Sequence, residues 1–107
     1  MIPTSEIAKL HVLLEKRGIE HVVMTEQYPR GDAFWIQSPN WNTDKGKRWS
    51  VACTPYSYGG ESNLLEFWDG NQGHDPMGYL TATEALRCVL DVSARDVARR
   101  PREVGIA

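Results

Sequence analysis

The chain has 107 residues, of which 41% are hydrophobic and 24% charged, and its formal net charge is −2. This size and balance fit one small globular domain and exclude a disordered chain or a fibrous repeat. The slight acidity argues against a strongly basic nucleic-acid module. Because no run of about 18 apolar residues is present, we expect no membrane-spanning helix.

The cysteines and the first residues suggest a compartment. Cys53 and Cys88 are too few for a disulfide framework and are compatible with a reducing cytoplasm. Residues 1–6 lack the charged start and apolar core of a signal peptide. We therefore expect a cytoplasmic protein.

The first predicted element is a helix over residues 5–17. Thr4 or Ser5 can cap its N-terminus, and Gly18 can end it in the left-handed conformation. Apolar residues recur at three- and four-residue spacing and predict one buried stripe: Ile7, Leu10, Leu13 and Leu14.

Short segments rich in β-branched and aromatic residues follow and predict strands. They cover residues 19–25, 33–37, 49–54 and 63–68. Residues 28–32 predict a turn, and the polar, glycine- and proline-containing stretches 38–48 and 69–78 predict loops.

The strands carry apolar residues on both faces. In the second strand Trp35 points away from Phe34 and Ile36, and in the fourth Trp68 points away from Phe67. One face can be covered by helices. The other must be covered by loops or by a partner.

The second helix has a clear start. Thr81 and Glu84 form a capping box, and the apolar pattern that follows continues towards Pro101. The order of elements predicts an α+β fold, with an antiparallel sheet of three to four strands and an N-terminal and a C-terminal helix packed on one face. We expect a single domain over residues 1–98 and a basic, frayed tail over residues 99–107.

Neither a metal site nor a cofactor is expected. His11, His21 and His74 are the chain's histidines, and no Cys-x-x-Cys or His-x-x-x-His motif accompanies them.

Enzymatic activity is not expected either. Cys53 and Cys88 sit on apolar patterns, where a free cysteine usually acts as a small hydrophobic residue. An acid–base site would require Glu66, Asp69 and His74 to meet in space.

Composition favours protein binding, because four tryptophans and four tyrosines are many for a small domain. Large amphipathic rings bury much area at little cost in rotamer entropy. The predicted contact residues are Trp35, Trp41, Tyr58, Glu61 and Glu66. A homodimer through the same face is the simpler version of this hypothesis.

Nucleic-acid binding is the alternative. In residues 41–49 three basic side chains lie between two tryptophans, which could stack bases and neutralise phosphates. The residues concerned are Lys45, Lys47 and Arg48, together with Arg99 and Arg100 in the tail. Binding of this kind would be weak and strongly salt-dependent.

Two segments, LLEKRGIE at residues 13–20 and YLTATEALRCVL at residues 79–90, resemble small phage- or prophage-encoded proteins of actinobacteria. The usual proline after the capping threonine is replaced by Ala82, and the chain continues past the usual end. The resemblance implies a non-enzymatic inhibitor of a host defence complex, of the anti-CRISPR type, that occludes a site on a bacterial host protein or ribonucleoprotein. Such inhibitors share no common motif, so no residue role carries over.

Overall fold

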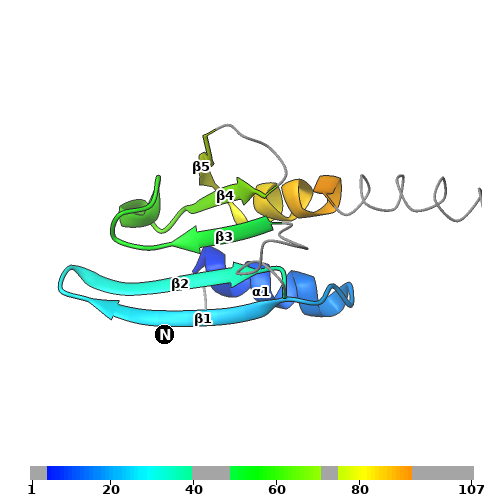
Figure 1. The fold of residues 1–107 in the computed structure, drawn as a ribbon, viewed down its shortest axis with the longest axis horizontal. Coiled ribbons are helices and arrows are strands. Elements are labelled where there is room, and N and C mark those ends of the chain that lie inside the picture. The colour runs from blue at the N-terminus through cyan, green and yellow to red at the C-terminus, as the bar shows by residue number, and fades with distance from the viewer. Residues whose placement is uncertain (1–4, 40–48, 71–74, 93–107) are drawn as a thin grey trace, which may run out of the picture.

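The computed structural model describes residues 5–39, 49–70 and 75–92. A first helix, α1 (Glu6–Lys16), precedes an antiparallel sheet, and a C-terminal helix over residues 82–92 follows it. The sheet runs in chain order, β1-β2-β3-β4-β5. Its strands are β1 (Val22–Tyr28), β2 (Gly31–Gln37), β3 (Trp49–Cys53), β4 (Leu65–Asp69) and β5 (Met77–Leu80), and a short 3-10 helix, η1 (Gly60–Ser62), lies between β3 and β4. Figure 1 shows β1 and β5 at opposite edges.

Helix α1 begins and ends at the expected residues. The Ser5 hydroxyl accepts a hydrogen bond from the Ala8 N–H at 3.3 Å, as an N-cap does. Gly18 has φ 68°, which permits the chain to turn back, and the Ile19 N–H then donates to the Leu14 carbonyl at 3.0 Å.

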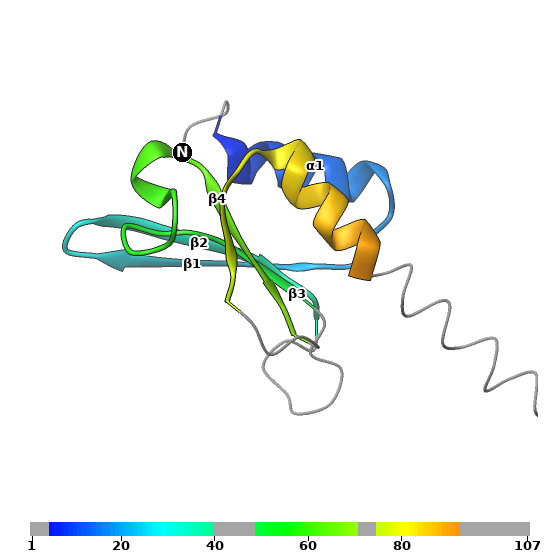
Figure 2. The ribbon, with the colours of Figure 1, turned by 90° about the horizontal axis from the view of Figure 1, so that it is seen from above.

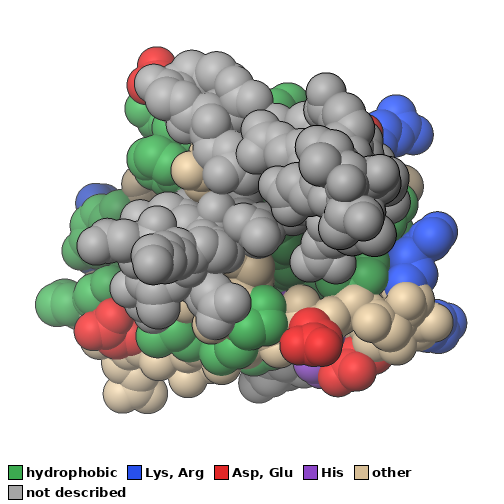
Figure 3. All heavy atoms as spheres, turned by 45° about the vertical axis from the view of Figure 1, so that its right-hand side comes forward, with side chains coloured by type: hydrophobic (Ala, Val, Ile, Leu, Met, Phe, Trp, Pro, Cys, Tyr) green, Lys and Arg blue, Asp and Glu red, His purple; other side chains and the backbone are tan. Residues whose placement is uncertain are grey.

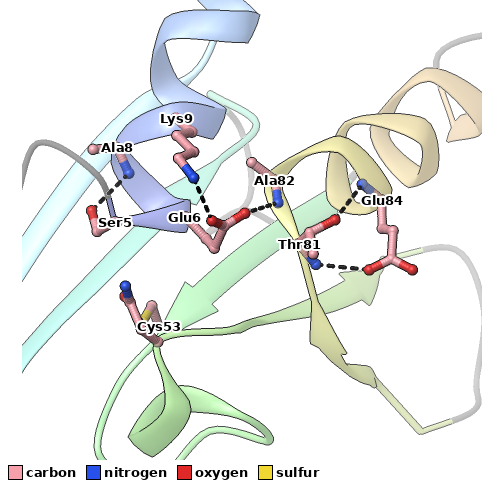
Figure 4. A network of polar contacts seen from close by, with 9 residues as sticks. Ser5, Glu6, Ala8, Lys9, Cys53, Thr81, Ala82 and Glu84 are labelled. Atoms are coloured by element: carbon pink, nitrogen blue, oxygen red, sulfur yellow. Dashed lines mark hydrogen bonds and ion pairs between the residues drawn. The ribbon is translucent and has the colours of Figure 1, made fainter.

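The C-terminal helix begins with the expected capping box. The Thr81 N–H donates to the Glu84 carboxylate at 2.9 Å, and the Glu84 N–H donates to the Thr81 hydroxyl at 3.3 Å. Glu6 of α1 also reaches this helix start, because its Oε1 accepts from the Ala82 N–H at 2.7 Å (Figure 4). The two helices, far apart in sequence, are therefore joined at their N-terminal ends.

Both helices pack on one face of the sheet, as the view from above shows (Figure 2). Alternate residues of β2, β3 and β4, among them Ile36, Val51 and Leu65, turn towards them and are almost fully buried. Leu10 and Leu14 of α1 and Val89 of the C-terminal helix fill the other side of this core.

The α+β class and the placement of both helices on one face are confirmed. The sheet has five strands, since β5 begins inside a stretch whose glycines and proline predicted a loop. The first strand starts three residues later than expected, because Ile19 turns back onto α1 before β1 begins. Pairing of Tyr28 with Gly31 shortens the predicted turn to Pro29 and Arg30.

The C-terminal boundary of the domain at residue 98 and the tail over residues 99–107 lie outside the described residues. Within the described part of the chain, neither helix is long and apolar enough to cross a membrane.

Candidate functional site

The face of the sheet opposite the helices carries four large aromatic rings. We call this surface the aromatic face and define it by Met24, Tyr28, Trp35, Tyr56 and Trp68. No described helix or strand packs against it (Figure 2). Trp68 is 41% exposed, and Trp35 is half-buried.

A shallow depression of about 580 Å³ lies on the aromatic face. It follows from the strand register, because Trp35 of β2 pairs with Ala52 of β3, and Ser50 of β3 pairs with Trp68 of β4. The small residues of the central strand thus separate two tryptophans. Large and small residues alternate along β3, and this alternation is the source of the shape.

Glu66 lies at the centre of the polar contacts on this face. It is only 8% exposed, and both of its carboxylate oxygens are used. Oε1 accepts from the Trp68 indole N–H at 2.9 Å, and Oε2 accepts from the Tyr58 backbone N–H at 2.9 Å. Glu66 therefore fixes the ring of Trp68 and the loop that carries Tyr58.

The same loop also rests against β5. The Tyr79 N–H donates to the Tyr58 carbonyl at 3.2 Å. Gly78 lies so close to Tyr58 that a Cβ atom there would overlap the Tyr58 side chain. Tyr58 is thus held from two sides while 55% of it stays exposed.

A cluster of rings occupies the other end of the aromatic face. Tyr28 makes edge-to-face contacts with Trp35, at 6.3 Å between centroids, and with Tyr56, at 5.7 Å. The Arg30 guanidinium lies 5.9 Å from the Tyr56 ring centroid, within cation–π range. A hydrogen bond from the Tyr28 hydroxyl to the Glu26 carboxylate raises the pKa of Tyr28, because it stabilises the protonated phenol.

Only some of the predicted contact residues lie at the depression on the aromatic face. Trp35 and Glu66 line the depression, and Tyr58 is exposed beside it. Glu61 is exposed on η1 and lines a separate depression with Arg30. Trp41 lies outside the described residues.

Sequence reasoning did not select Tyr28, Tyr56 or Trp68 as contact residues, although the structure gathers them. The alternation of β4 already set Trp68 opposite Phe67, so the sequence held the signal for that residue. Tyr28 belongs to the predicted turn over residues 28–32 and Tyr56 follows the predicted strand over residues 49–54, and their meeting depends on the pairing of β2 with β3.

The residues of the nucleic-acid hypothesis lie outside the described part of the chain. They are Lys45, Lys47, Arg48, Arg99 and Arg100. Trp49, which follows this loop, is 3% exposed and belongs to the core, so its ring does not stack on bases in this fold.

The cysteines are poor nucleophiles here. Burial raises the pKa of the Cys53 thiol, and burial together with the nearby Asp91 raises that of Cys88. Of the three groups that an acid–base site would need, Glu66 is occupied by its two N–H donors and His74 lies outside the described residues.

Comparison with known proteins gave no match to any family model, curated protein or solved structure.

Proposed function

We propose that this chain is a non-enzymatic protein-binding domain and that the aromatic face is its contact surface. One observation carries the proposal: two tryptophans flank a depression floored by small residues, and a buried carboxylate holds one of them in place. Tryptophan and tyrosine contribute most often to binding hot spots, because a rigid ring loses little conformational freedom when it is buried. A preorganised ring lowers the cost of binding further.

Charge favours a basic partner segment. The described residues that line the depression include Glu26 and Glu66 and no lysine or arginine. The chain as a whole carries 12 basic and 14 acidic side chains, so its formal net charge is only −2. A partner segment that combines arginine or lysine with an apolar side chain would complement both the rings and the charge.

The test uses the full chain with single substitutions. A tagged protein is incubated with bacterial lysate, with and without nuclease, and the captured protein is then titrated against each variant. Trp35→Ala and Trp68→Ala are each expected to weaken binding by about 1–3 kcal/mol, because each removes an anchoring ring. Val12→Ala, on the helix side of the molecule, is the control and should bind as the parent does.

Circular dichroism and thermal melting separate loss of contact from loss of fold. Folded tryptophan variants that bind as tightly as the parent would contradict the assignment of the aromatic face. Unfolding of both variants would show that these rings belong to the core. Trp41→Ala applies the same test to the remaining predicted tryptophan.

The more specific hypothesis, an inhibitor of a host defence complex that acts by steric occlusion, stays a prediction that rests on the sequence resemblance. The identity of a nuclease-resistant partner decides it. Recovery of nucleic acid, with charge reversal at Lys47 and Arg48 abolishing it at low salt, would favour the alternative. Sedimentation of the chain alone tests the homodimer.

A further inference from the structure

Two histidines that are ten residues apart meet at the surface. His11 lies on α1, and His21 directly precedes β1, after the chain has turned back at Gly18. The distance between His11 Nδ1 and His21 Nε2 is 2.9 Å. Glu15, one turn further along α1, places its Oε1 3.7 Å from His11 Nε2. In the space-filling view, a histidine side chain lies beside acidic side chains at the lower edge of the molecule (Figure 3).

The backbone determines which nitrogen of His21 carries the proton. His21 Nδ1 lies 2.7 Å from the Ile19 carbonyl oxygen, which can only accept a hydrogen bond. Nδ1 therefore carries the hydrogen, and in the neutral ring the lone pair of Nε2 points towards His11. A backbone carbonyl that orients an imidazole in this way is the usual outer partner of a metal-binding histidine.

The spacing of the two nitrogens fits a metal ion. Bonds from nitrogen to zinc are about 2.0–2.1 Å long, so two such bonds at about 90° place their nitrogens about 2.9 Å apart. A tetrahedral ion would need about 3.3 Å, a shift of roughly 0.4 Å. Both rings are partly exposed and lie nearly perpendicular, at 75°. With two bonds at about 90°, each nitrogen–metal bond lies about 45° from the line that joins the two nitrogens, so both rings must rotate for their lone pairs to meet at one point.

We propose that His11 and His21 bind one divalent transition-metal ion. The ion displaces the hydrogen from His11 Nδ1 and bonds this nitrogen and His21 Nε2 from beside the line that joins them, and His11 then carries its proton on Nε2. Glu15 Oε1 lies 3.7 Å from that nitrogen, beyond hydrogen-bond distance, and would have to move closer to accept the proton and orient the His11 ring as an outer partner. Imidazole ligands favour zinc, copper and nickel over magnesium and calcium. Water completes the coordination, since the site is open to solvent.

Such an ion would link α1 to the start of β1. Near the turn at Gly18, the hydrogen bond from the Ile19 N–H to the Leu14 carbonyl already holds the chain that leads into β1 against α1. The site lies on the helix side of the sheet, because His11 also lines a groove with Val12 and Val23. It is therefore independent of the aromatic face, and its test is independent of partner binding.

The experiment is a calorimetric titration of the full chain with zinc chloride. One ion per chain is expected, and His11→Gln and His21→Gln should each weaken binding by about tenfold or more. His74→Gln removes the remaining histidine and should leave the affinity unchanged. Magnesium chloride should not bind, because it prefers oxygen ligands.

Nitrogen-15 spectra of the imidazole rings give a second measurement that does not depend on the variants. Zinc is expected to shift His11 Nδ1 and His21 Nε2 and to leave His74 in place. Absence of binding up to about 1 mM zinc would overturn the proposal. So would variants that fold and bind zinc as the parent does, or ring signals of His11 and His21 that do not respond.

Discussion

The two faces of the sheet differ in composition and in what holds them together. The face under the helices is lined by aliphatic side chains such as Ile36, Val51 and Leu65, which are buried almost completely. The aromatic face is lined by half-exposed rings and by polar side chains that have hydrogen-bond partners, Glu66 above all. The face under the helices therefore contributes most of the stability of the fold. The aromatic face presents side chains whose positions are already fixed before a partner binds.

The largest expected difference between the faces is in stability. Leu10→Ala should lower the free energy of unfolding by about 2–5 kcal/mol, because Leu10 is fully buried between α1 and the sheet. Chemical denaturation measures this change. Val12→Ala, on the exposed side of the same helix, should change stability by less than about 0.5 kcal/mol. If Trp68→Ala were more destabilising than Leu10→Ala, the comparison of the two faces would be wrong.

Glu66→Gln tests the support beneath the aromatic face. Glutamine offers one acceptor oxygen, whereas Glu66 receives two N–H groups, so one donor loses its partner. We expect a loss of about 1–3 kcal/mol in the free energy of unfolding, together with a change in tryptophan fluorescence. Glu61→Gln is the matched control, since Glu61 is exposed on η1. Equal behaviour of the two variants would refute the supporting role of Glu66.

A smaller effect concerns the junction of the two helices. The Ala82 N–H, followed by Lys9, lowers the pKa of Glu6 from its ordinary value of 4.5, and the capping contacts with Thr81 lower that of Glu84. A lowered folded-state pKa stabilises the fold above the unfolded value, and this contribution is lost as the pH falls below about 4.5.

Unfolding followed from pH 6 down to about pH 3 measures this loss. Glu6→Gln should flatten part of the pH dependence, because it removes one of the two carboxylates, Glu6 and Glu84, whose pKa the fold lowers. An unchanged profile in Glu6→Gln would show that the contact to Ala82 does not contribute.

The smallest change in the free energy of unfolding is expected at β1, which lies at the edge of the sheet face that the helices cover. Val23 of β1 belongs to the helix side but is 48% exposed, since the helices do not reach over it fully. Val23→Thr should therefore change the free energy of unfolding by less than about 0.5 kcal/mol. A loss of more than about 1 kcal/mol, measured by the same denaturation, would mean that the core extends to β1.

Much of the fold could be predicted, because its signals are local. Ser5, Gly18 and the Thr81–Glu84 pair end or begin helices through contacts within a few residues, and each does so in the structure. The alternation in β2 also placed Trp35 opposite the core correctly. The strand β5 was missed because its glycine is typical of loops, whereas pairing with β4 and contact with Tyr58 hold it in the sheet.

The candidate site was predicted only in part. Trp35, Tyr58 and Glu66 are predicted contact residues, and the structure adds that Glu66, which lines the depression, is only 8% exposed and accepts hydrogen bonds from Trp68 and from the backbone of Tyr58. A single sequence gives the face on which a side chain lies. The depth at which the side chain lies depends on neighbours from other strands.

By itself the sequence determined both ends of α1, the start of the C-terminal helix, which side chains of β2 and β4 share a face, and the α+β class, because these follow from backbone chemistry and from the periods of helix and strand. Tertiary structure alone decided that Glu6 meets Ala82, that Glu66 joins Trp68 to the loop of Tyr58, and that His11 meets His21. The physical reason is that each of these contacts joins residues from different elements. Their distances are set by the packing of helices on the sheet, which no local pattern records.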